Sequence, residues 1–322
     1  MTNDNENETA VGPNQTPVPK AMPLRELCHK YGIRFKKGLG QNLLLDDNIN
    51  TIMVEAAGLG PQDSVIEVGS GLGALTRRLC RKAGRLLCVE IDQSFMPCLQ
   101  DQFGGMPNVR LFRGDILNHS LGDLVNEYLP GATELKMVSN LPYYITTPIL
   151  FHFLEAPVFF SRIVIMVQLE VGQRLVAGVN TSDYGVLTIA AALRAEVDLV
   201  HRVPATCFVP RPKVDSAIVR FRLRQPALMP ESEIRFVMRV VRAAFSQRRK
   251  TLRNGLTHSG AFGAPKESVI EALEAVGIDP GRRPQTVKVQ DWIRLAEEIR
   301  KRLPRQEPEK AEESVSSDDW AE

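Results

Sequence analysis

The tetrapeptide Asn140-Leu141-Pro142-Tyr143 combines residue types that suit the binding of an aromatic amine. The Asn140 side-chain oxygen and the Leu141 carbonyl can both accept hydrogen bonds from an NH2 group. Pro142 fixes its own φ and favours an extended Leu141, which turns that carbonyl toward a ligand. The Tyr143 ring can stack on an extruded base, which is worth about 1–3 kcal/mol. We therefore expect a site that orients the exocyclic amine of an extruded adenine.

A tetrapeptide of this kind also occurs in ordinary strand-to-turn segments. Its position, at the end of the fourth expected strand and downstream of the ligand-binding turn described next, favours the functional interpretation. Phe208, in the segment Cys207-Phe208-Val209-Pro210-Arg211-Pro212, is a second candidate for base stacking. For Phe208, packing in the core is an equally good interpretation.

A glycine-rich turn, Glu67-Val68-Gly69-Ser70-Gly71-Leu72-Gly73, follows the first expected strand. Alternate glycines let the backbone bend sharply and come close to a ligand. A dinucleotide-binding turn needs its third glycine one position later, in the pattern G-x-G-x-x-G. The sequence also contains no G-x-x-x-x-G-K-[ST] segment. The turn therefore disfavours NAD and excludes a P-loop.

Two acidic residues complete the expected cofactor site. Glu90 ends the second strand, where a carboxylate can accept hydrogen bonds from both hydroxyls of a ribose. Asp115 follows the third strand and can accept from the amine of an adenine. Acids at strand ends are common, and a glycine turn can be a turn and nothing more. In this order and spacing, however, they favour S-adenosylmethionine, which has no phosphate to bind.

These residues follow different strands, so they can form one site only if a sheet brings the ends of those strands together. The sequence predicts five strands separated by helical stretches such as Ala74–Lys82; the strands are Ser64–Val68, Leu86–Ile91, Val109–Phe112, Lys136–Ser139 and Ile163–Val167. This alternation is typical of an α/β fold, a parallel sheet with helices on both faces. Such sheets bind ligands at the carboxyl ends of their strands. An earlier helix begins at Asp47 and ends at Gly58.

The pattern changes after residue 225, where Pro226 and Pro230 interrupt the chain. Apolar residues at helical spacing then predict a helix through Ile234 and Phe245, and two more helices follow at Val269–Val276 and Trp292–Leu303. We expect a small all-helical C-terminal domain. The predicted organisation is a disordered tail (1–22), a catalytic domain (23–225), a helical RNA-binding domain (226–305) and an acidic disordered tail (306–322).

The net charge of +2 conceals an uneven distribution, because residues 306–322 carry seven acids and one base. The part between the tails is basic, which suits a polyanion or an ordinary solvated surface equally well. One basic cluster is suited to phosphate contacts, which position an RNA without reading its sequence; it consists of Arg248, Arg249, Lys250 and Arg253. A solvated helix end is the alternative.

Several classes of protein are disfavoured. The five cysteines form no C-x-x-C pair, and the five histidines lack metal-ligand spacing, so neither a disulfide framework nor a metal site is expected. There is no apolar run long enough to span a membrane, and residues 1–20 lack the features of a signal peptide. We expect a cytoplasmic protein, acting as a monomer.

From about Lys36 to Leu303, the chain resembles the ribosomal RNA small-subunit adenine dimethyltransferase family, the KsgA/RsmA type. The segments that carry the resemblance are Gly40–Asp46, Glu67–Thr76, Asn140–Tyr144, Tyr184-Gly185, Pro210–Ala217, Phe245–Arg253 and Arg282-Arg283-Pro284. Three positions depart from the family pattern: Leu43 replaces the usual Phe, Ser70 a common Pro, and Val186 a frequent Arg.

The resemblance implies a Rossmann-like methyltransferase fold with an S-adenosylmethionine site lined by Asn42, Leu44, Gly69, Glu90, Asp115 and Asn140. It also implies dimethylation of two adjacent adenosines in the 3′-terminal hairpin loop of 16S rRNA, in small-subunit biogenesis. The related 23S rRNA adenine methyltransferases share the same motifs, but Phe245–Arg253 and the basic helical domain favour the 16S enzyme. Two weaker alternatives are an assembly or transcription factor with vestigial catalysis and a DNA adenine methyltransferase.

Overall fold

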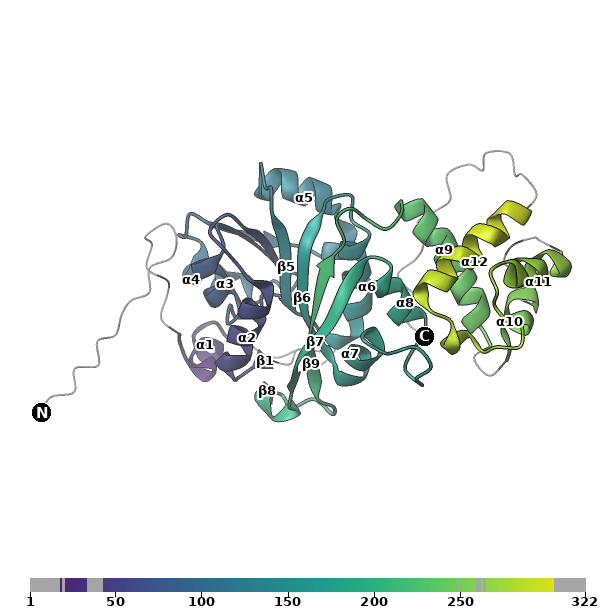
Figure 1. Cartoon of the computed structure of the whole chain (residues 1–322). Coiled ribbons are helices and arrows are strands. Elements are labelled where there is room, and N and C mark those ends of the chain that lie inside the picture. The colour runs from purple at the N-terminus through teal and green to yellow at the C-terminus, as the bar shows by residue number, and fades with distance from the viewer. Residues whose placement is uncertain are drawn as a thin grey trace, which may run out of the picture. The chain divides into compact units, whose positions relative to one another are not determined.

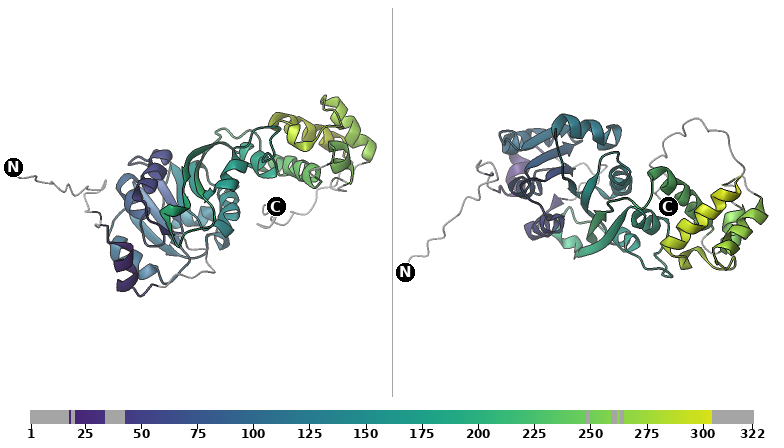
Figure 2. Two further views of the ribbon diagram at one scale, coloured as in Figure 1. Left: turned by 90° about the horizontal axis from the view of Figure 1, so that it is seen from below. Right: turned by 45° about the horizontal axis from the view of Figure 1, so that its top comes forward.

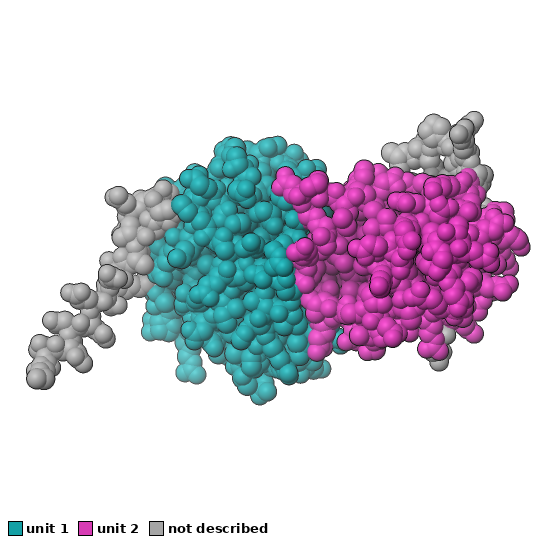
Figure 3. All heavy atoms as spheres, viewed as in Figure 1, with its two compact units in different colours: residues 1–172, 198–223 teal, residues 173–197, 224–322 magenta. Residues whose placement is uncertain are grey.

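The computed structural model describes residues 18, 21–33, 43–247, 250–258, 262 and 265–303, and the chain divides into two compact units (Figure 3). Unit 1 comprises residues 1–172 and 198–223, and unit 2 comprises residues 173–197 and 224–322. Residues 173–197 thus group with the C-terminal helices, although they precede the expected domain boundary near residue 225. That boundary stays a prediction, as do the two disordered tails.

Unit 1 is built on a seven-stranded sheet with the order β4-β3-β2-β5-β6-β9-β7 (Figure 1). The strands are β2 (Ser64–Val68), β3 (Arg85–Glu90), β4 (Val109–Arg113), β5 (Leu135–Asn140), β6 (Phe160–Gln168), β7 (Ala195–Val203) and β9 (Ser216–Leu223). The strands from β2 to β6 pair in parallel, whereas β9 pairs antiparallel with β6. The expected α/β sheet is confirmed, and all five predicted strands are present.

The inner strands β2 and β3 are buried on both faces, which explains why they are mainly apolar runs rather than alternating ones. Every residue of β2 is buried. On one face a core is formed by the sheet and three helices, α2 (Asp47–Ala57), α3 (Thr76–Lys82) and α4 (Met96–Phe103). Further helices, among them α5 (Leu121–Tyr128) and α6 (Thr146–Leu154), complete the layered arrangement (Figure 2).

Helix α2 shows how local sequence sets the ends of an element. The side chain of Asp46 accepts a hydrogen bond from the backbone N–H of Asn48 at 2.9 Å, which caps the first turn. Gly58 ends the helix in the left-handed conformation, which a side chain would strain. Both limits agree with the sequence prediction.

Several elements of the fold were not predicted from the sequence. Strands β7 and β9 extend the sheet, and a small separate sheet pairs β1 (Leu43–Leu44) with β8 (Phe208–Val209). Two short helices, α1 (Leu24–Lys30) and α7 (Leu169–Leu175), were also not predicted. The β1–β8 pairing joins segments far apart in the sequence, so no local pattern could indicate it.

Unit 2 is mainly helical. Its helices are α8 (Val186–Ala192), α9 (Glu231–Phe245), α10 (Leu252–His258), α11 (Lys266–Ala275) and α12 (Val289–Arg302). Trp292 is fully buried in its core, with its ring centroid 6.1 Å from that of Phe245. The hydroxyl of Tyr184 donates to the carbonyl of Val287 at 2.8 Å. Among the described residues, no helix has the length and apolarity needed to cross a membrane.

Candidate active site

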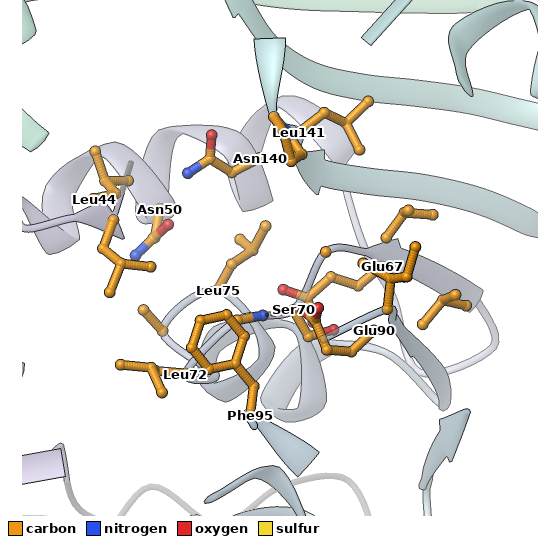
Figure 4. A pocket seen from close by; sticks show the side chains of 18 of the residues that line it. Leu44, Asn50, Glu67, Ser70, Leu72, Leu75, Glu90, Phe95, Asn140 and Leu141 are labelled. Atoms are coloured by element: carbon orange, nitrogen blue, oxygen red, sulfur yellow. Dashed lines mark hydrogen bonds between the residues drawn. The ribbon is translucent and has the colours of Figure 1, made fainter. Parts of the chain in front are cut away.

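A cavity of about 390 Å³ opens at the carboxyl ends of β2, β3, β4 and β5 (Figure 4). This is the sheet edge at which α/β proteins bind ligands. Its walls include most of the residues predicted for the cofactor and the target base: Leu44, Gly69, Gly71, Glu90, Asp115, Asn140, Leu141, Pro142 and Tyr143. All of them belong to unit 1.

The glycine turn and the Asn-Leu-Pro-Tyr corner lie side by side on the wall of this cavity. Gly69 has a φ of +74°, and a Cβ placed on it would lie 3.9 Å from the carbonyl oxygen of Asn140 and 3.8 Å from Cδ of Pro142. The strands behind are also joined, since the backbone N–H of Val68 donates to Oγ of Ser139 at 2.9 Å. The two halves of the predicted site are therefore neighbours.

Glu90 is a buried carboxylate held by the backbone. Its Oε2 accepts from the N–H of Gly71 and its Oε1 from the N–H of Asp92, both at 2.8 Å. Burial raises the pKa of Glu90, and these backbone hydrogen bonds oppose the rise. A carboxylate has about four acceptor positions, so Glu90 can still accept hydrogen bonds from the hydroxyl groups of a ligand.

Asp115 has a structural as well as a candidate binding role. Its Oδ1 accepts from the N–H of Leu117 at 3.0 Å and so caps the short helix Ile116–Asn118. Its Oδ2 lies 3.5 Å from Nδ2 of Asn118, which is at the limit of a hydrogen bond. The cap fixes the carboxylate at the cavity wall and leaves Oδ2 with acceptor capacity.

The Asn-Leu-Pro-Tyr corner is held rigid by its surroundings. The carbonyl of Pro142 accepts from Oγ1 of Thr146 at 3.0 Å and from the N–H of Ile145 at 3.2 Å. The hydroxyls of Tyr143 and Ser216 are hydrogen-bonded at 2.6 Å, and burial raises the pKa of Tyr143. These contacts position the tyrosine ring at the cavity wall.

Phe208 does not lie on the cavity wall. Its side chain is 2% exposed and packs in the core beneath the sheet. Its backbone pairs with Leu44, which does line the cavity. In this structure Phe208 is a core residue that supports β1, so the base-stacking interpretation is replaced by the packing one.

The other predicted residues are not among those that line the cavity, or they fall outside the described part of the chain. Asn42, Arg248 and Arg249 lie outside the described residues. Lys250 and Arg253 are exposed in unit 2, Arg253 in the first turn of α10. Among the described residues, no group of three or more His, Cys, Asp or Glu side chains could hold a metal ion.

Glu67 is a buried acid in the glycine-turn segment, and no role for this residue was predicted from the sequence. It is 1% exposed, and its Oε2 accepts from Oγ1 of Thr76 at 2.6 Å. Burial is the main cause of a pKa raised to about 7, and the hydrogen bond from Thr76 opposes the rise. An acid near the end of an otherwise apolar strand was the signal that could have identified it.

The raised pKa of Glu67 predicts a specific pH dependence of stability. The folded chain keeps this proton up to about pH 7, whereas an unfolded glutamate loses it near 4.5. The contribution of Glu67 to the stability of the wild type therefore falls as the pH rises from about 5 to 7, by about 1.4 kcal/mol per pH unit at most. Glu67→Gln, which stays neutral, should gain stability relative to the wild type over that range, measured by denaturant unfolding.

The comparison between variants isolates Glu67 from the other titrating groups. Glu134→Gln makes the same chemical change at an exposed glutamate in unit 1 and serves as the matched control. A stability difference between the wild type and Glu67→Gln that stays constant from pH 5 to 8 would contradict the assignment.

Comparison with known proteins agrees with this geometry. Residues 32–301 match the family described as Ribosomal RNA adenine dimethylase. The chain is 40% identical over 273 residues to Ribosomal RNA small subunit methyltransferase A of Bacillus cytotoxicus, covering 84% of this chain and 94% of the relative. A protein of the same name from Shouchella clausii is 39% identical over 281 residues, covering 87% and 95%.

Two solved structures are similar over most of the chain. A dimethyladenosine transferase from Plasmodium falciparum aligns with a TM-score of 0.70 and 25% identity, covering 81% of this chain and 98% of that one. The 23S rRNA methyltransferase ErmE aligns with a TM-score of 0.62 and 29% identity, covering 80% and 100%.

Proposed function

The chain belongs to the ribosomal RNA adenine dimethylase family, and from this premise we propose that it dimethylates two adjacent adenosines in the 3′-terminal hairpin loop of 16S rRNA. The methyl donor in this proposal is S-adenosylmethionine. The observation that carries it is the close approach of the glycine turn to the Asn-Leu-Pro-Tyr corner, where Gly69 lies against Asn140. A donor and an acceptor of a methyl group can meet there.

The cavity suits S-adenosylmethionine in size and in chemistry. Its volume is within the usual range of small-molecule sites, about 300–1,000 Å³, at about 390 Å³. Glu90 would hold the ribose hydroxyls and Asp115 the adenine amine, because both are acceptors at successive strand ends. Gly69 and Gly71 allow close approach of the backbone. When bound, S-adenosylmethionine supplies a methyl group on an electrophilic sulfonium sulfur.

The residues of the corner would act on the target adenine. The Asn140 side-chain oxygen and the Leu141 carbonyl accept from the amine, which orients its lone pair and favours a pyramidal nitrogen. The Tyr143 ring, fixed through Ser216, stacks on the base and offsets part of the cost of extruding it. Rate enhancement on this scheme comes from orientation and needs no covalent intermediate.

An assay with purified particles tests the choice of RNA. The chain should methylate 30S precursors isolated from cells without this activity and leave 50S precursors unlabelled, and digestion of the labelled RNA should give N6,N6-dimethyladenosine. Labelling of 50S particles instead would favour a 23S enzyme such as the ErmE-like neighbour.

The basic cluster predicts a change in the salt dependence of RNA binding. Lys250 and Arg253 are exposed, and each phosphate contact contributes about 0.7–0.9 to the slope of log K against log[salt]. The double variant Lys250→Gln/Arg253→Gln should therefore flatten the slope by about 1–2, measured by filter binding to a 16S fragment.

A matched pair of basic residues outside the cluster controls for the loss of positive charge alone. Lys82 ends α3 and Arg110 lies near the amino end of β4, opposite to the edge that forms the cavity, and both are exposed. Lys82→Gln/Arg110→Gln removes the same charge and should leave the slope unchanged. Equal slopes for the two double variants would reject the role of the cluster.

A further inference from the structure

A buried side-chain atom of Asn50, a residue that lines the cavity, has no hydrogen-bond partner within the described part of the chain. Asn50, on α2, is 2% exposed, yet its side chain lines the cavity. Its Oδ1 is buried and has no hydrogen-bond partner. A buried acceptor left without a donor costs about 1–3 kcal/mol, so such atoms are rare unless a ligand or water completes them.

The orientation of this amide is fixed by its neighbour Asp47. The guanidinium of Arg78 donates to both carboxylate oxygens of Asp47, from Nε at 2.7 Å and from Nη2, and lowers the pKa of Asp47. Nδ2 of Asn50 lies 3.3 Å from Oδ1 of Asp47. Because an ionised carboxylate accepts and cannot donate, the NH2 group of Asn50 must face it. Oδ1 of Asn50 is thereby turned away from Asp47.

The sheet order indicates which end of a ligand reaches Asn50. Along the carboxyl edge of the sheet, Asp115, the proposed acceptor for adenine, follows β4, and Glu90, the proposed acceptor for ribose, ends β3. The glycine turn follows β2, and the Asn-Leu-Pro-Tyr corner begins at the end of β5. Helix α2 packs on β5 and β6. Figure 4 shows the Asn50 amide on the opposite side of Leu75 from Glu90. A ligand with its nucleoside at Asp115 and Glu90 therefore directs its other end toward α2.

We propose that Oδ1 of Asn50 accepts a hydrogen bond from the α-ammonium group at the amino-acid end of S-adenosylmethionine. This inference rests on the proposed use of that donor. An unpaired acceptor requires a donor, and at this end of the molecule the ammonium donates whereas the carboxylate does not. The bond makes Asn50 a cofactor-binding residue.

The amine of the target adenine is the other N–H donor that enters this cavity. Asn50 is deep, at 2% exposed, whereas Tyr144 beside the corner is 58% exposed and marks the side open to a base. Depth thus assigns Asn50 to the cofactor rather than to the RNA. The following experiment separates the two donors.

The test measures binding of two ligands by calorimetry, without turnover. One is S-adenosylhomocysteine, and the other is its analogue lacking the α-amino group. The wild type should bind the deaminated analogue on the order of tenfold more weakly, as expected for a hydrogen bond to a charged group. Asn50→Leu should bind S-adenosylhomocysteine on the order of tenfold more weakly and the analogue as the wild type does. Asn50→Asp, which keeps the acceptor, should retain the preference for the amino group.

Asn108→Ala is the matched control. Asn108 is also buried, but its Nδ2 donates to the carbonyls of Cys80 and Ala83 and it does not line the cavity. This change should lower stability and leave the ratio of the two affinities unchanged.

Three outcomes overturn the inference or its premise. Equal weakening of both ligands by Asn50→Leu would show that Oδ1 is completed by water or serves packing. Weaker calorimetric binding of a 16S fragment by Asn50→Leu, with unchanged binding of S-adenosylhomocysteine, would assign the bond to the target amine. If the wild type binds no S-adenosylhomocysteine, the proposed cofactor itself fails, and Asn50 is no longer at issue.

Discussion

Replacing Asn140 by alanine is expected to lower kcat for methyl transfer by about two orders of magnitude, since one positioned polar group contributes about 10²–10³-fold in comparable sites. The change removes the side-chain acceptor for the target amine. It leaves the backbone carbonyl that approaches Gly69, so binding of S-adenosylhomocysteine should change little. Single-turnover methylation of a 16S fragment, together with calorimetry, measures the two effects separately.

Asn126→Ala supplies the control for Asn140→Ala. Asn126 is exposed on α5 in the same unit, and its loss should alter neither rate nor binding. Methyl transfer by Asn140→Ala at a rate near that of the wild type would mean that the corner does not orient the amine.

Replacing Glu90 by glutamine is expected to weaken binding of S-adenosylhomocysteine by about 10²-fold, as two hydrogen bonds to a charged acceptor are lost or weakened. The glutamine amide also turns a donor toward the N–H of Gly71 or Asp92, both of which need an acceptor. Because burial raises the pKa of Glu90, binding to the wild type should also weaken as the pH falls toward that pKa. Calorimetry between pH 5 and 8 measures both effects.

Asp123→Asn is the control for the loss of a negative charge. Asp123 is exposed in the first turn of α5. If Glu90→Gln binds S-adenosylhomocysteine as tightly as this control variant does, the ribose assignment is wrong.

The sequence was most informative where a side chain's role depends on its place at a strand end. Residues Gly69, Glu90 and Asn140 were predicted to meet because parallel strands bring their carboxyl ends to one edge. The structure brings all three to one cavity. The family resemblance adds what geometry cannot supply, the nature of the RNA.

The sequence was least informative where a role depends on distant packing. Phe208 has the residue type of a stacking platform, but its burial depends on pairing with β1, 164 positions earlier at Leu44. Asn50 has the periodicity of an ordinary helix position, and its unpaired oxygen appears when α2 is placed over the sheet edge. Strand β9 is antiparallel to β6, which no alternation of strands and helices predicts.

Mass spectrometry of 16S rRNA tests the central claim most directly. RNA from cells that carry the wild-type gene should contain two adjacent N6,N6-dimethyladenosines in the 3′-terminal hairpin loop. RNA from cells without the gene, or with the Asn140→Ala form expressed at the same level, should contain unmodified adenosines there. Identical modification in all three strains would contradict the assignment of methyl transfer to this cavity.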